Sequence, residues 1–291
     1  MELSLVLVLV LAVVVGITLG LFGGGGSLLM VPLLTYVAGT EPKEAIAASL
    51  FIVGVTSLIS TFAHTRAGNV RWRTGVVFGA AGMVGAFLGG LVGGHLPGAL
   101  LMIAFALMMV ATAVSMLRGK KNNLSGPGEE PRSLPLRRVV LDGLVVGVIT
   151  GLVGAGGGFL VVPALALLGG LAMPAAVGTS LLVIAMKSFA GLAGYMATVS
   201  VDWTLLTTVT AVTVVGSLIG TLLTSRVPET ILRKGFGVFV LIMGIFVLFQ
   251  ELPAPLGPIL AVGASALAGV LLLCRLLSDH CPLLPSLRAQ T

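Results

Sequence analysis

The chain has 291 residues, of which 57% are hydrophobic and only 9% are charged, and its mean hydropathy is +1.16. One soluble core cannot bury that much apolar surface, so the composition places the chain in a membrane. The formal net charge of +6 does not indicate nucleic-acid binding, because the cations occupy short segments between apolar runs, as the positive-inside rule expects. The runs are continuous rather than alternating, which predicts an all-α integral membrane protein and not a transmembrane β-barrel.

A series of apolar runs follows along the chain, and two of them are short. A helix that spans a membrane needs about 20 residues, so the runs at 27–38 and 158–170 are expected to be half-helices. The others are long enough, or nearly long enough, to cross. In chain order the full set is 3–22, 27–38, 43–64, 74–95, 97–117, 139–153, 158–170, 173–197, 203–225, 229–250 and 257–277.

The sequence repeats itself. The segment from Gly16 to Pro32 aligns without a gap with Gly147 to Pro163, an offset of 131 positions (163 − 32), and the same offset pairs Trp72 with Trp203. Two halves that each open on a glycine cluster within an apolar run are typical of transporters built from structural repeats. The predicted divisions are a first repeat, a linker, a second repeat, and a C-terminal transmembrane helix with a tail, at 1–117, 118–138, 139–250 and 251–291.

Charge predicts the orientation of the repeats. The linker and the loop at 65–73 are rich in Lys and Arg, so both are expected on the cytoplasmic side. The expected location is the cell inner membrane, which the chain crosses several times. The loop near Pro228, with Arg226, Arg233 and Lys234, is a third cytoplasmic anchor. Counting back from it makes 139–170 a re-entrant hairpin, and the repeat makes 3–38 its mirror. Each repeat is then a glycine-broken re-entrant helical hairpin followed by three transmembrane helices. Three crossings are an odd number, so the two repeats have inverted topology. A continuous broken helix over 3–38 would change this parity, and that alternative stays open.

The glycine clusters are candidate ligand sites. They interrupt helices at membrane depth, where free backbone groups must be buried in protein or line a wet cavity. The half-helices that follow direct N–H groups and positive dipole ends at this cavity, which favours an anion. The alternative is that the glycines only permit close helix packing. The candidate substrate-binding residues of the two tips are Gly24, Gly25, Gly26, Ser27, Gly156, Gly157 and Gly158.

Lys187 is the one cation deep inside an apolar run, and a buried ammonium is costly unless it is paired. A bound anion is its natural partner; the alternative is that it extends to the membrane surface or contacts backbone carbonyls. Ser49, Thr179 and Ser180 are added as candidate donors to an oxyanion, although hydroxyls in membrane helices also bond their own backbone. No catalytic set, metal site, nucleotide motif or cofactor is expected.

The stretches GITLGLFGGGGSLLMVPLL and GLVGAGGGFLVVPALALLGG, followed by AAVGTSLLVIAMKSFAGLAGY and VDW, resemble the TauE/SafE family of sulfite and organosulfonate exporters. The resemblance covers roughly residues 3–250. It implies an integral membrane transporter of small sulfur-containing anions, commonly one that exports them from a bacterial cytoplasm. This agrees with the anion inferred from the residues, whereas the sulfur comes from the resemblance alone.

The leading hypothesis is a secondary transporter, an exporter, that works by alternating access and binds its anion between the two tips near the bilayer midplane. The alternatives are an anion channel, a permease for another small organic anion such as a carboxylate, and uptake in place of export. The expected partners are the small anionic substrate and the lipid bilayer. A coupling proton or sodium ion and a homodimer remain open expectations.

Overall fold

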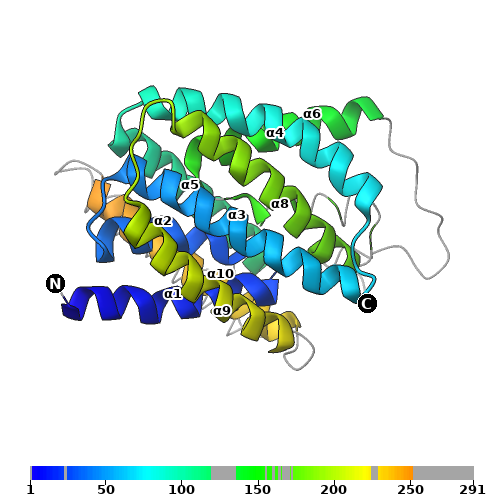
Figure 1. The fold of residues 1–291 in the computed structure, drawn as a ribbon, viewed down its shortest axis with the longest axis horizontal. Coiled ribbons are helices and arrows are strands. Elements are labelled where there is room, and N and C mark those ends of the chain that lie inside the picture. Colours follow the sequence, from blue (N-terminus) through cyan, green and yellow to red (C-terminus); the bar gives the residue numbers. More distant parts are fainter. Residues whose placement is uncertain are drawn as a thin grey trace, which may run out of the picture.

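The computed structural model describes residues 2–22, 25–118, 136–154, 156–158, 161, 162, 165, 171, 173–223 and 229–251. The described chain is helical and contains no strand, as predicted (Figure 1). Its elements are α1 (Glu2–Phe22), η1 (Gly25–Leu29), α2 (Met30–Pro32), η2 (Leu33–Val37), α3 (Pro42–Arg66), α4 (Trp72–His95), α5 (Gly98–Arg118), α6 (Leu136–Val153), α8 (Met173–Tyr195), α9 (Trp203–Leu223) and α10 (Glu229–Glu251). The predicted site residue Gly24, nearly all of the linker, most of the limb at 158–170 and the last apolar run lie outside the described residues.

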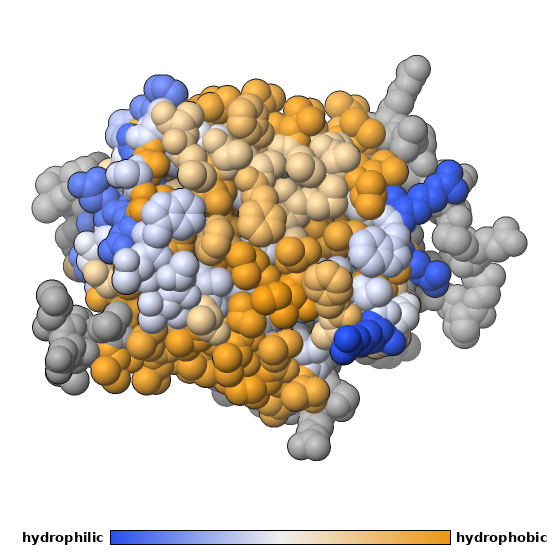
Figure 2. Space-filling model, in the orientation of Figure 1, coloured by the Kyte–Doolittle hydropathy of each residue, from blue (hydrophilic) through white to orange (hydrophobic). Residues whose placement is uncertain are grey.

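The surface of the helices is apolar, as lipid contact requires. Among the described residues, four helices are long and apolar enough to cross a membrane: Pro42–Arg66, Trp72–His95, Ala175–Tyr195 and Trp203–Leu223. Figure 2 shows a hydrophobic band across the middle of the molecule, with hydrophilic residues gathered at the two ends of the helices. Leu222 is 76% exposed and Phe62 is 65% exposed, whereas Lys187 and several hydroxyls are buried. The interior is also mainly apolar, so what distinguishes this chain from a water-soluble protein is its apolar surface.

Each repeat packs a helix against the other repeat: α1 lies against α9, and the equivalent α6 lies against α4. Gly16 in α1 lies against α9, since a Cβ added to it would be 2.3 Å from the Thr213 carbonyl oxygen. The equivalent Gly147 in α6 lies against α4, with its added Cβ 2.3 Å from the Gly82 carbonyl oxygen. Small residues allow such close backbone approach. Gly20 and Gly151 repeat the contact one turn later, in the same order along both helices, so α1 runs parallel to α9 and α6 parallel to α4.

The equivalent helices α3 and α8 pack side by side in the middle of the bundle (Figure 1). An added Cβ on Gly178 would lie 3.2 Å from the His64 Cβ, one on Gly54 would lie 3.3 Å from the Ser188 Cβ, and one on Gly191 would lie 3.3 Å from the Leu50 Cδ1. Contacts with later residues of α3 thus involve earlier residues of α8. The two helices are therefore antiparallel, and residues related by the repeat offset come level with each other around Thr56 and Lys187.

The helices α1 and α3 both begin at one end of the molecule. The Asp202 N–H donates to Glu44 Oε1 at 3.0 Å, so α9 begins beside the start of α3. Because α1 runs parallel to α9, α1 also begins at this end. The chain from Glu2 to Pro42 thus returns to the end from which it left.

The helices α6 and α8 both begin at the opposite end. The Arg71 N–H donates to Thr179 Oγ1 at 3.0 Å, so α8 begins beside the start of α4. Since α6 runs parallel to α4, α6 begins there too. Leu136 and Met173 therefore both lie at the end that carries the loop between α3 and α4.

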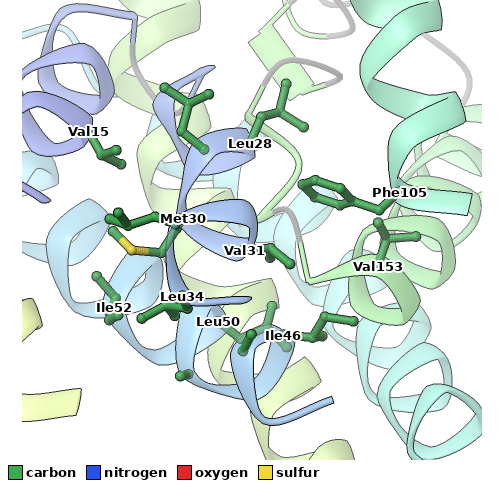
Figure 3. Packing of buried hydrophobic residues seen from close by; sticks show 14 of the residues in the cluster. Val15, Leu28, Met30, Val31, Leu34, Ile46, Leu50, Ile52, Phe105 and Val153 are labelled. Atoms are coloured by element: carbon green, nitrogen blue, oxygen red, sulfur yellow. The ribbon is translucent and has the colours of Figure 1, made fainter. Parts of the chain in front are cut away.

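The returning limb of the first hairpin, η1 with α2 and η2, is buried in the apolar core. Leu28, Met30 and Val31 are each 0% exposed. Figure 3 shows this limb surrounded by apolar side chains from four other helices: Val15 of α1, Ile46, Leu50 and Ile52 of α3, Phe105 of α5 and Val153 of α6. Burial of this limb fixes the depth of the first glycine tip.

Candidate functional site

The two glycine tips touch. A Cβ added to Gly156 would lie 3.4 Å from the Ser27 Cβ, although the two residues belong to different repeats. The same added atom would be 2.6 Å from Val53 Cγ1 and 3.4 Å from Ile184 Cγ2, so the tips meet against the contact between α3 and α8. Ser27 is 0% exposed. The structure thus places the predicted Ser27, Gly26 and Gly156 together inside the protein.

The second tip has a backbone shape that requires glycine. Gly154, Gly156 and Gly157 have φ values of +74°, +59° and +75°, in the left-handed region that other residues avoid. The Val161 N–H then donates to the Gly157 carbonyl at 2.9 Å, which is the bond of a helical turn. The predicted Gly158 is buried within this turn. The glycine cluster therefore serves to reverse the chain and not only to permit close packing.

Two side chains hold the end of α6, where helical carbonyls lack partners within the helix. Ser49 Oγ donates to the Gly154 carbonyl at 2.6 Å, and Tyr195 Oη donates to the Leu152 carbonyl at 2.5 Å. The hydroxyl of Ser49, predicted to face a ligand, is thus directed at the backbone of the second tip. Its role in the structure is to fix where this tip lies.

Lys187 places a buried ammonium at the second tip. The residue is 1% exposed, and its Nζ donates to Thr150 Oγ1 at 3.2 Å. A Cβ added to Gly157 would lie only 2.8 Å from Nζ, and one added to Gly82 would lie 2.7 Å from Cδ, so the stem passes α4 to reach the tip. The side chain does not extend to the surface. Among the described residues Thr150 is its one hydrogen-bond partner, which leaves the charge without a counter-ion there.

The remaining predicted hydroxyls lie elsewhere. Thr179 accepts the Arg71 N–H at the end of the molecule, so it is not with the tips. Ser180 donates to the Val177 carbonyl of its own helix at 2.7 Å. These two residues show that the hydroxyl-rich start of α8 includes groups used for structure.

Three other polar residues near the centre were not among the predicted site residues. Thr150 bonds Lys187, and Ser57 and Ser188 are equivalent positions on α3 and α8 that are both 0% exposed. In the part of the chain that the structure describes, neither serine hydroxyl has a hydrogen-bond partner. The repeat alignment carried a signal for both features: it matches Ser57 with Ser188, and it replaces Thr150 by an apolar residue in the first half.

Only the second repeat has the lysine and its partner. The equivalents of Thr150 and Lys187 are Leu19 and Thr56. Leu19 is 0% exposed in an apolar cluster, and Thr56 Oγ1 donates to the Ile52 carbonyl of its own helix at 2.6 Å. The bundle therefore holds one charge at its centre within the described residues. No group of three or more His, Cys, Asp or Glu in those residues is placed to hold a metal ion.

Broken helices that meet inside an apolar bundle, next to a buried cation, are the features of a multi-pass membrane transporter. Comparison with known proteins gives the same class. The chain belongs to the sulfite exporter TauE/SafE family, whose model matches residues 8–247. This confirms the family that the glycine-rich stretches resembled.

Several relatives match over most of their length. A probable membrane transporter protein of Xylella fastidiosa is 35% identical over 243 residues, covering 81% of this chain and 92% of that protein. The probable membrane transporter protein MJ0441 of Methanocaldococcus jannaschii is 31% identical over 200 residues, covering 67% and 73%. The probable membrane transporter protein YdhB of Bacillus subtilis is 29% identical over 245 residues, covering 84% and 100%. No solved structure matches the chain.

Proposed function

We propose that this protein is a secondary transporter that exports small sulfur-containing anions, such as sulfite or organosulfonates, and binds them at the meeting point of the two tips. The observation that carries the proposal is the Lys187 ammonium, which is 1% exposed, lies against Gly157 and has one neutral hydrogen-bond partner among the described residues. A buried cation without a counter-ion is unfavourable, and an anion at the tip would remove that cost.

The chemistry around Lys187 suits an oxyanion. A sulfonate or sulfite group has three oxygens, which can accept hydrogen bonds from the ammonium and from neighbouring donors. Bonds between ionised partners in a dry site are stronger than bonds between neutral groups. The preference for sulfur over carboxylate or phosphate is taken from the family alone.

The arrangement of the helices supports alternating access. The antiparallel pair α3 and α8 and the two hairpins that enter from opposite ends are what inverted-topology repeats produce. In such transporters the site lies between repeats that rock against each other, so it opens to each side in turn. The tips of this protein meet at that kind of position, with one tip from each repeat.

The proposed orientation follows the cations. Arg66, Arg71 and Arg73 lie at the end where the second hairpin enters and leaves, and the positive-inside rule puts this end in the cytoplasm. The linker at 118–138 belongs to the same side, because α6 begins there. We place the protein in the bacterial inner membrane, with the first hairpin entering from outside.

Replacing Lys187 tests the proposal directly. Purified protein is screened by thermal unfolding against sulfite, taurine, sulfoacetate, sulfate and simple carboxylates. Removing one partner of a buried charge pair costs about 2–5 kcal/mol, so Lys187→Met should weaken binding at least about 30-fold and abolish the stabilisation by anions. The empty variant should unfold at the same temperature as the wild type or higher, because methionine fills the apolar site without a buried polar group.

Lys43→Met is the matched control. Lys43 Nζ donates to the Gly94 carbonyl at 3.0 Å, at the end of the molecule where α3 begins. The variant therefore loses a lysine that does not contact the tips. It should keep the response to anions. Unchanged stabilisation of Lys187→Met by the anions would refute the proposed site.

Counterflow in vesicles separates a carrier from a channel. An excess of unlabelled anion inside should drive transient accumulation of labelled anion if each site carries one anion per cycle. A channel would show no such accumulation, which would leave an anion channel as the function of the same site.

A further inference from the structure

We infer that Lys187 also carries the coupling ion: the side chain is an uncharged amine when the site is empty and an ammonium when an anion is bound, so that one proton crosses the membrane with each monoanion. This inference rests on the proposed function and names the coupling ion of that same site.

The surroundings of Lys187 contain no fixed counter-charge. The nearest acid in the chain on a helix packed against it is Asp142, eight residues before Thr150 on α6, which is about 12 Å along the axis. The described parts of the second tip carry no charged residue. The other titratable groups on the packed elements lie near helix ends: Arg73 and His95 of α4, Arg137 and Arg138 of α6, Lys43, Glu44, His64 and Arg66 of α3, and Tyr195 of α8.

The empty site therefore favours the neutral amine. An ammonium held there would have one neutral hydrogen-bond partner in an apolar setting, and the cost of burying such a charge is usually avoided by losing the proton. A neutral amine with one partner costs far less than an ammonium in the same place, because no charge is removed from water.

Thr150 can serve both forms of the lysine. Its Oγ1 lies 3.2 Å from Lys187 Nζ and 3.2 Å from the Gly147 carbonyl oxygen. When the lysine is charged, Nζ donates to the hydroxyl, and the hydroxyl proton goes to the carbonyl. When the lysine is neutral, the hydroxyl can rotate and donate to the nitrogen lone pair. The pair thus has a complete hydrogen bond in either state.

Anion and proton binding reinforce each other at this site. A monoanion beside the ammonium makes a neutral pair, so each partner lowers the cost of the other, and this linkage is reciprocal. A sodium ion is disfavoured, because its charge would repel the ammonium. The first repeat offers Leu19 and Thr56 at the equivalent positions, so the centre supplies one proton-binding group per cycle.

Neutral loading has a measurable consequence. Two forms of the site are neutral: the empty site with an uncharged Lys187, and the loaded site with an ammonium and a monoanion. If only these two forms switch between facing the cytoplasm and facing outside, transport moves no net charge. The direction of transport should then follow the pH gradient and the anion gradient together, whereas the membrane potential should have no effect. Export therefore proceeds while the cytoplasmic excess of anion outweighs an inward proton gradient.

The test uses the full chain in proteoliposomes with isethionate, a sulfonate that stays ionised and so carries no proton itself. A trapped pH dye reports protons, labelled isethionate reports the anion, and potassium with valinomycin sets the potential. We expect isethionate entry to acidify the lumen by about one proton per anion, at a rate unchanged by the potential. Isethionate flux without acidification, or flux that follows the potential, overturns the coupling but leaves the proposed transport standing. No isethionate flux at all overturns both.

Two variants locate the proton. Arginine stays charged at any working pH, so Lys187→Arg should bind isethionate without taking up a proton, as measured by calorimetry in two buffers that differ in ionisation enthalpy. Asp142→Asn should keep the wild-type uptake. Wild-type uptake in Lys187→Arg, or its loss in Asp142→Asn, would assign the proton to another group. If the arginine variant does not fold, the wild-type vesicle measurement decides the question alone.

Discussion

Replacing Gly156 by alanine tests whether the shape of the second tip sets the site. Two costs add. The φ of +59° is left-handed, which costs an L side chain about 1–2 kcal/mol. The new Cβ would lie 2.6 Å from Val53 Cγ1, so the tip or Val53 must shift, and such overpacking costs about 1–3 kcal/mol. We expect the free energy of unfolding to fall by about 2–5 kcal/mol, and binding to weaken because the tip moves relative to Ser27.

Gly39 provides the matched control. Its φ is +74° but an added Cβ meets nothing within 4 Å, so Gly39→Ala should have only the first cost and should keep anion binding. Val53→Ala in the Gly156→Ala background removes the contacted methyl and should recover about 1–3 kcal/mol in a double-mutant cycle of unfolding in detergent. Equal destabilisation by the two alanines, or a strictly additive cycle, would refute the reasoning.

Two further predictions compare buried serines. Ser49→Ala leaves the Gly154 carbonyl without its 2.6 Å hydrogen bond, so unfolding should become easier by about 1–3 kcal/mol. Wild-type stability of this variant would mean that the tip does not depend on Ser49. Ser57→Ala and Ser188→Ala each remove a hydroxyl that has no partner in the described structure, so thermal unfolding should stay the same or shift upward. A clear loss of stability in either variant would contradict that assignment.

The helices were predictable because each is a long apolar run, and the pairing of the halves was predictable because the offset of 131 holds across glycine-rich faces. The direction of α1 was not. Its 21 residues are enough to span a membrane, so length alone allowed a continuous broken helix. What decides its course is the neighbour against which Gly16 and Gly20 pack, and that contact joins residues nearly two hundred positions apart.

The site was partly predictable for a similar reason. A single lysine in an apolar run is conspicuous, so Lys187 was identified from the sequence. Its partner Thr150 was not, since threonine is common in membrane helices and the contact exists only because the second hairpin brings α6 beside α8. Ser49 and Thr179 show what the sequence leaves undetermined: the partner of a hydroxyl depends on its rotation about the helix, which gives Ser49 the Gly154 carbonyl and Thr179 the Arg71 N–H.

The packing of α3 against α8 explains why the repeats differ in chemistry while they agree in shape. Thr56 and Lys187 are equivalent positions and lie level with each other where these antiparallel helices meet. A lysine at both would place two ammonium groups near one point; at a separation of about 6 Å and an effective dielectric of 20 their repulsion is about 3 kcal/mol. One lysine avoids this repulsion and matches the charge of a monoanion. The two repeats can therefore present two equivalent tips to one ligand. The single charge of a monoanion, however, is balanced only because one of the equivalent positions is Lys187 and the other is the neutral Thr56.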